Sequence, residues 1–392
     1  MRRPGHILDL EGPDPLDAVV VPAPALALSP LDVLLRRRAA LGLPAVTPPA
    51  VLFIPLGYLL GPQALGVLPT PALEYLDVAV VVALATLGSL VGMSLELRHR
   101  DDARALRAAV LEAVSTAIVV TGAMAWLLAR WQLPLDLSPL VAALTLGLAA
   151  SASSAGTPEA GTDAQHDAAS RIATLDDVVP IVGTGAMLVL LRATSMTEVL
   201  GLSALTVGLG AILAAAGWLL FEPLGDTAER SVYVIGILVA IGGATAYLRL
   251  SPLAAGVAAG LVWSLSPGIA DRIVRRHVSK IQHALVVVLL VVAGARMVLD
   301  ASALWLLVAC VLLRVAGKVL GGWLATRLVP HVGPADLGAY LLAPGLIGIA
   351  SALVVGQAVG SAAGTAVVTA AAAATVVSEL VALVVIPGGA RS

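Results

Sequence analysis

Two adjacent aspartates, Asp176 and Asp177, stand in the middle of the apolar stretch RIATLDDVVPIV. A carboxylate at bilayer depth costs about 2.5–3.5 kcal/mol even on the scale derived from insertion experiments. The basic counterpart is Lys318 in RVAGKVLGGWLATRL, since Lys280 is the other lysine of a chain that has 23 lysine and arginine residues. We expect Lys318 to face the aspartate pair, because an intramembrane charge is far less costly when it is paired.

The chemistry that this group suggests is ion exchange. Two carboxylates against one ammonium leave one negative charge, which a proton or a metal cation must neutralise. Asp177 is therefore the expected binding position of a monovalent cation or a proton. Lys318 can lose its own proton when buried, which an arginine does not do. The alternative is an ion pair that only fixes helix packing, with the second aspartate reaching toward water.

Composition defines the class of protein that holds these charges. Of 392 residues, 59% are apolar and 12% charged, and the mean hydropathy is +0.98. Windows of about 20 apolar residues recur, each long enough to cross a bilayer as a helix, whereas the alternating strands of a barrel are missing. The net charge of −2 argues against nucleic-acid binding, and the single cysteine, Cys310, excludes an intrachain disulfide. No cofactor is expected.

The pattern predicts an all-α polytopic membrane protein with 12–13 transmembrane helices. A thirteenth candidate begins at Ala18 and contains three prolines, which disfavour an isolated helix. The twelve expected spans are 50–67, 74–97, 105–130, 135–155, 171–192, 197–222, 231–249, 252–267, 281–299, 302–326, 335–358 and 361–387.

Basic residues in the connecting segments predict the orientation. When the spans alternate, the stretches 36–38, 98–107 and 271–280 fall on one side, and positively charged loops mark the cytoplasmic side. The C-terminus falls on the same side. We therefore expect a multi-pass protein of the cell (inner) membrane whose C-terminus is cytoplasmic.

Two spans are expected to be broken rather than regularly helical. LAASASSAGTPEAG places serines and a threonine ahead of a proline at the end of one span, and LLAPGLIGIASALV places Pro344 and Gly345 inside another. Proline removes a helical hydrogen bond and frees carbonyl groups. Each segment alone is equally well read as a kinked helix, but paired discontinuous helices are the sequence sign of a transporter's binding site.

The residues at these positions resemble a known family, the cation:proton antiporters of the sodium/proton exchanger superfamily, in the bacterial form with a DD motif. The motifs follow the family's order over about 340 residues. They are LGLPAVTPPAVLFIPLGYLLGPQALGVL, LVGMSLELRHRDDARALR, IATLDDVVPIV, VVAGARMVLD with RVAGKVLGGWLA, LGAYLLAPGLIGIASALVV and SELVALVVIP.

The resemblance implies a fold and a set of roles. Inverted repeats with crossed broken helices would form a core domain beside a scaffold (dimerisation) domain. The expected divisions are an N-terminal extension over 1–45 and an antiporter domain over 46–392, with core helices in 105–192 and 302–387 and scaffold helices in 50–97 and 197–299. Asp177 would be the main cation and proton carboxylate, Asp176 the partner of Lys318, and the polar break would consist of Ser153, Ser154 and Thr157.

The other charged residues inside the spans are expected to stabilise the structure rather than to bind the cation. Glu96 is expected to cap a helix end, and Glu112 to reach the membrane interface. Glu379 lies deeper and is expected to pair with Arg314 or Arg296. Arg314 precedes Lys318 by four residues, so it shares a helix face with it. It would neutralise a second carboxylate or anchor the helix as an auxiliary residue.

The expected function is secondary antiport of a monovalent cation for protons, electrogenic and by alternating access. Na⁺ is the first expectation, with Li⁺ or K⁺ as alternatives, and the protein is expected to be a homodimer in the lipid bilayer. One alternative is a non-transporting, antiporter-like membrane sensor, because the stretch between Ser154 and Asp176 is short and polar. The other is an intramembrane aspartyl protease. It is disfavoured because Asp176 and Asp177 lie about 100° apart on one helix rather than on two facing helices, so an enzyme is not expected.

Overall fold

The computed structural model describes residues 48–95, 100–131, 137–154, 164–221, 227–266, 270–330, 332–334, 336–360 and 362–385. The extension over 1–45 with its proline-rich candidate span, Glu96 and Thr157 lie outside these ranges. The described residues are helical apart from turns and one short extended bridge. The helices are α2 Pro49–Leu60, α3 Thr70–Ser94, α4 Arg100–Trp131, α5 Pro139–Ser151, α6 Ala164–Asp176, α7 Val178–Arg192, α8 Met196–Phe221, α9 Thr227–Tyr247, α10 Pro252–Leu265, α11 Ala270–Ala295, α12 Ala301–Leu328, α13 Leu337–Tyr340, α14 Leu346–Val359 and α15 Ala362–Val385.

The expectation of a polytopic helical membrane protein is confirmed. Within the described ranges, 8 helical segments are long and apolar enough to cross a bilayer, and one of them, Asp167–Arg192, comprises α6 and α7. The shorter apolar helices α2, α5, α10 and α14 correspond to four more of the expected spans. Together these segments account for the twelve spans that the hydropathy pattern predicts.

Several expected boundaries differ from the structure, and the starts of α11 and α4 are two of them. The helix α11 begins at Ala270, so the basic stretch 271–280 is helical and not a loop. Its apolar residues Ile273, Val274 and Val278 are buried while Arg276 is exposed, which is the amphipathic pattern of a surface helix. The helix α4 begins at Arg100, five residues before the expected position 105. Both helices therefore extend past the apolar windows on which the expectation rested.

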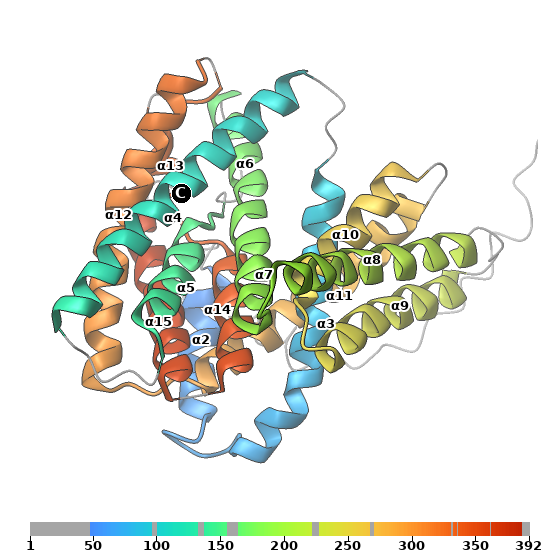
Figure 1. Ribbon diagram of the computed structural model, residues 1–392, viewed down its shortest axis with the longest axis horizontal. Coiled ribbons are helices and arrows are strands. Elements are labelled where there is room, and N and C mark those ends of the chain that lie inside the picture. Colours follow the sequence, from blue (N-terminus) through green and yellow to red (C-terminus); the bar gives the residue numbers. More distant parts are fainter. Residues whose placement is uncertain are drawn as a thin grey trace, which may run out of the picture. The chain divides into compact units, whose positions relative to one another are not determined.

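One group of helices surrounds the broken segments. The long helices α4 and α12 pack against each other, α4 also contacts α5 and α6, and α12 contacts α13 and α15. The short helix α14 packs against α5, α7 and α15. Figure 1 shows α4, α5, α12, α13 and α15 together, with α6, α7 and α14 beside them. Buried apolar residues of α4, α5, α12, α14 and α15 form one continuous cluster within this group.

The other group consists of α2, α3 and α8–α11. Here α3 packs against α9, α10 and α11, α10 packs against α8, and α2 packs against α11. The contact between α3 and α10 is very close, since a Cβ on Gly256 would lie 2.3 Å from the carbonyl oxygen of Ala85, and one on Gly88 would lie 2.2 Å from that of Leu253. Small residues allow such approach of helix backbones in membranes. The two groups meet where α7 contacts α8 and α10, and where α11 contacts α14 and α15.

Candidate functional site

Two chain breaks meet inside the first group of helices. The helix α5 ends at Ser151, and Ala152 then turns to an extended conformation at φ −68° and ψ 138°. The other break separates α13 from α14. The segments pair in antiparallel fashion, since Ser154 N donates to Ala343 O at 2.9 Å and Gly345 N donates to Ala152 O at 3.3 Å. The expected breaks are thus both present and directly hydrogen-bonded to each other.

The sequence of the second break explains this close contact. Pro344 lacks the N–H that a continuous helix would need. A Cβ on Gly345 would lie 2.7 Å from the carbonyl oxygen of Ser153, and one on Gly348 would lie 2.4 Å from that of Ala149. The start of α14 therefore packs directly on the backbone at the end of α5, which requires glycine at both positions.

A third interruption carries the aspartate pair. The helix α6 ends at Asp176 and α7 begins at Val178, with Asp177 between them at φ −58° and ψ −20°. Pro180 has no N–H to donate to the carbonyl of Asp176, four residues earlier, so the regular helical hydrogen bond is missing there. This places both carboxylates at an irregular point of an otherwise helical crossing.

The ammonium of Lys318 donates hydrogen bonds to several groups that lie around the breaks. On α12, its Nζ lies 3.2 Å from Asp176 Oδ2 and 3.0 Å from Glu112 Oε2, and all three side chains are 0% exposed. It also donates to Ser151 O and to Ser153 Oγ, each at 2.6 Å. The expected contact between Lys318 and Asp176 is present, and the buried cation is fully hydrogen-bonded.

Glu112 corrects the sequence interpretation. It was expected at the membrane interface, but it is fully buried, pairs with Lys318 and accepts a hydrogen bond from Thr116 Oγ1 at 2.8 Å. Because α4 begins at Arg100, Glu112 lies about 18 Å along the helix from its start. Lys318 lies about 15 Å from the end of α12 at Leu328, so the two side chains share a depth. The sequence did contain one sign that Glu112 is buried: Thr116 lies four residues later on the same helix face and can donate a hydrogen bond to it.

Arg314 binds carbonyl groups rather than a second carboxylate. Its guanidinium donates to Ala150 O, to Ala152 O at 2.8 Å and to Ala343 O at 3.3 Å, so it joins the two breaks. The last carbonyls of α5 have no helical donors, and they carry the negative end of the helix dipole. Arg314 and Lys318 together satisfy these carbonyls. Arg314 thus links the two breaks through their backbone carbonyls.

Asp177 differs from its neighbour in having no such partner. It is half-buried, and its Oδ1 is a buried atom without a hydrogen-bond partner in the part of the chain that the structure describes. Asp176, by contrast, binds Lys318 and also accepts from Ser153 N at 3.3 Å. With all groups ionised, Glu112, Asp176 and Asp177 outnumber Arg314 and Lys318, and Glu379 is a further buried carboxylate whose charge acts on Arg314. Negative charge is left over, and Asp177 is the carboxylate that carries an unsatisfied oxygen.

Two other residues that the sequence placed at or near the site, Ser154 and Glu379, make different contacts from those expected. Ser154 lies at the break, but it contributes its backbone N–H rather than a side-chain contact. Glu379 is buried on α15 and makes no direct salt bridge among the described residues, although the charge of Arg314 acts on it. Arg296 pairs with Asp77 instead.

The chain shares its fold with a known transporter. No family model matches the sequence, and no curated protein matches it. Among solved structures, that of the sodium proton antiporter MjNhaP1 from Methanocaldococcus jannaschii, at pH 8, aligns with a TM-score of 0.63. The alignment covers 89% of this chain and 95% of that chain at 16% identity. This likeness shows that the chain has the fold of a sodium/proton antiporter.

Proposed function

We propose that this protein exchanges a monovalent cation for protons across a membrane, with Asp177 as the residue that binds each in turn. The observation that carries the proposal is the buried oxygen of Asp177 that has no partner among the described residues, beside a cluster in which Lys318 is paired with Glu112 and Asp176. A buried carboxylate oxygen without a donor is costly unless a proton or a cation satisfies it. The fold shared with a sodium proton antiporter, and the meeting of two broken helices at this point, support the same function.

The charge on the site supports a monovalent cation as cargo. Asp177 supplies one carboxylate beside the group in which Lys318 is paired with Glu112 and Asp176, and one monovalent cation neutralises it. We propose Na⁺ as the cation, with Li⁺ and K⁺ as competitors of the same charge.

Two protons replace the cation in the returning state. One neutralises Asp177 and the other neutralises Asp176, which then separates from Lys318. Lys318 keeps Glu112, Ser151 O and Ser153 Oγ as its acceptors. Two protons for one cation moves net charge, so the exchange is electrogenic. This is also what the resemblance to the DD-motif branch implies.

Transport requires the site to face each side of the membrane in turn. We propose that the helices α4–α7 and α12–α15 move as a core against a scaffold of α2, α3 and α8–α11, in a homodimer. The protein would lie in the cell membrane with its C-terminus in the cytoplasm. The breaks, Lys318 and both aspartates all belong to the core elements, so the site can travel intact while contacts to the scaffold change.

The experiment is proton movement in proteoliposomes that contain a pH-sensitive dye. Adding Na⁺ should dissipate an imposed pH gradient, and Li⁺ and K⁺ are compared at the same concentration. Asp177→Asn should abolish this response. Asp167→Asn is the matched control, because Asp167 lies on α6 ten residues before Asp177 and is exposed. Full exchange by a well-folded Asp177→Asn protein would overturn the proposal.

The same vesicles separate the proposal from its alternatives. A sensor that does not transport would leave the pH gradient intact with every cation tested. An aspartyl protease needs two carboxylates that share a proton and activate water. Asp176 is instead bound to Lys318, which leaves Asp177 as the one aspartate of the pair with an unsatisfied oxygen. Imposing a membrane potential then tests electrogenicity, since electroneutral exchange would not respond to it.

A further inference from the structure

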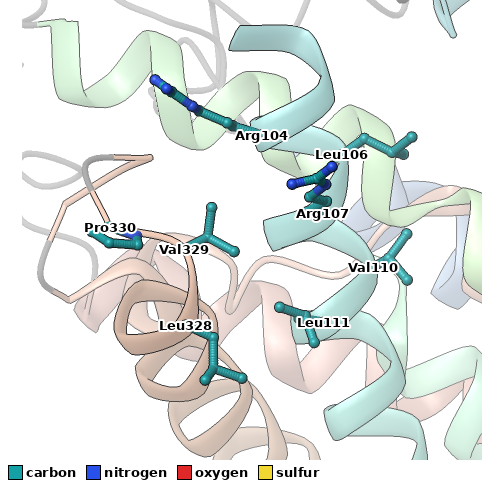
Figure 2. A pocket seen from close by; sticks show the side chains of 8 residues that line it. All are labelled: Arg104, Leu106, Arg107, Val110, Leu111, Leu328, Val329 and Pro330. Carbon is teal, nitrogen blue, oxygen red and sulfur yellow. The ribbon is translucent and has the colours of Figure 1, made fainter. Parts of the chain in front are cut away.

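A groove lies between the start of α4 and the end of α12, away from the charge cluster. Its volume is about 760 Å³, and its lining combines the arginines Arg104 and Arg107 with aliphatic side chains. Figure 2 shows the two arginines in the upper half of the view and the aliphatic residues Leu111 and Leu328 below them. The groove therefore has a basic rim and an apolar wall.

The charges of the groove are placed for an anion. Arg104 and Arg107 are three residues apart, so they project from the same side of α4. Both are exposed, and Arg107 makes no ion pair with any residue that the structure describes. An arginine guanidinium matches the geometry of phosphate oxygens and binds them with parallel hydrogen bonds.

The apolar wall belongs to membrane-spanning helices. Leu328 is the last residue of the apolar segment Ala301–Leu328 and is 59% exposed. Val110 and Leu111 lie one to two turns beyond Arg104 on α4, about 10 Å further along the helix axis. A ligand that fits both parts has an anionic head and a hydrocarbon tail.

We propose that this groove binds an anionic phospholipid, with the phosphate at Arg104 and Arg107 and an acyl chain along Val110, Leu111 and Leu328. A free phosphate would neutralise the arginines but leave the apolar wall uncovered, and a zwitterionic lipid would bring no net negative charge to them. Basic pockets between transmembrane helices are suited to acidic lipid headgroups for this reason.

Because the groove lies between α4 and α12, a bound lipid should stabilise the packing of these two helices. Leu111 lines the groove, and the next residue on α4, Glu112, is bound to Lys318 of α12. A lipid seated between the ends of α4 and α12 adds contacts to both helices and stabilises the arrangement in which they pack. A ligand that binds only the folded state raises the melting temperature by an amount that grows with the logarithm of its concentration above the Kd.

The test is a lipid titration of the purified protein in neutral detergent, read out as the melting temperature. Phosphatidylglycerol should raise it progressively as the lipid concentration exceeds the Kd, and phosphatidylcholine should not. Arg107→Ala should weaken the apparent affinity for phosphatidylglycerol about fivefold, the effect expected for one arginine at a charged lipid surface. Arg107→Lys should retain most of the affinity. Arg276→Ala is the control, because Arg276 is an exposed arginine on α11 outside the groove.

A second variant tests the apolar half of the site. Leu328→Trp should fill the groove and abolish the phosphatidylglycerol shift while leaving the melting temperature in phosphatidylcholine unchanged. Equal stabilisation by phosphatidylcholine, or by inorganic phosphate alone, would overturn the proposal. So would an unchanged titration in Arg107→Ala, or a lipid shift that survives in Leu328→Trp.

Discussion

Lys318 is held by Glu112 as firmly as by Asp176, with its Nζ 3.0 Å from Glu112 Oε2 and 3.2 Å from Asp176 Oδ2. This second carboxylate changes what Lys318 can do. A lysine with one partner would lose its counter-charge whenever that partner took up a proton. With two partners, Asp176 is free to change its protonation state while the ammonium stays compensated.

Removing the ammonium should be more damaging than removing one carboxylate. Lys318→Gln leaves Glu112 and Asp176 buried without a counter-charge, and we expect a loss of about 3–5 kcal/mol of folding free energy. Glu112→Gln leaves Lys318 paired with Asp176, so its loss should be smaller. The double variant should lose less than the sum of the two single losses, because the groups interact directly. Denaturation of the three variants measures this, and simple additivity would contradict the pairing.

A polar contact between the two groups of helices should stabilise the C-terminal turns of α14. Asp77 on α3 accepts from Gln357 Nε2 of α14 at 2.9 Å and also pairs with Arg296 at the end of α11. Gln357→Ala should speed hydrogen exchange in the C-terminal turns of α14, since it removes a hydrogen bond worth about 0.5–1.5 kcal/mol. Glu74→Gln, an exposed carboxylate on the same helix α3, is the control. Equal hydrogen-exchange rates in the parent protein, Gln357→Ala and Glu74→Gln would show that the contact does not stabilise α14.

The close approach of α3 and α10 should depend on its glycines. In Gly256→Ala the new Cβ would lie 2.3 Å from Ala85 O, a backbone atom that cannot turn aside, so the helices must separate. We expect a loss of about 1–3 kcal/mol from this overpacking. Gly243→Ala on α9 is the matched control, because its Cβ would meet no atom within 4 Å. Thermal melting compares the two, and equal melting temperatures would refute the steric argument.

The start of α12 should weaken in acid. Hydrogen bonds from Ala303 N–H and then from the Ser302 hydroxyl hold the pKa of Asp300 below its ordinary value. A lowered pKa in the folded state contributes stability that is present above the unfolded pKa of about 3.9 and is lost as the pH falls through the folded value. Asp300→Asn keeps an N-cap acceptor but not the charge. Its melting temperature should therefore approach that of the parent protein below about pH 4, and a constant difference from pH 3 to pH 6 would contradict this.

The sequence by itself determined the class of protein and two of the places where the helices break. Apolar windows specify a spanning helix because the bilayer offers no other partner for backbone polar groups. Pro344 and Gly345 specify an interruption because each changes what the backbone can bond or approach, whereas the interruption at Asp177 was not expected. The pairing of Lys318 with Asp176 was also accessible, since both are costly charges in apolar surroundings.

Only the tertiary structure decided how the remaining charges are used. Glu112 and Lys318 are separated by 206 residues, and nothing local to either one shows that α4 and α12 pack with these side chains at the same depth. The same holds for Arg314, which binds the carbonyls of two breaks, and for Arg296, which binds Asp77 instead of Glu379. A buried charge is neutralised by whichever group the fold brings near it, and that choice depends on helix packing across the whole chain.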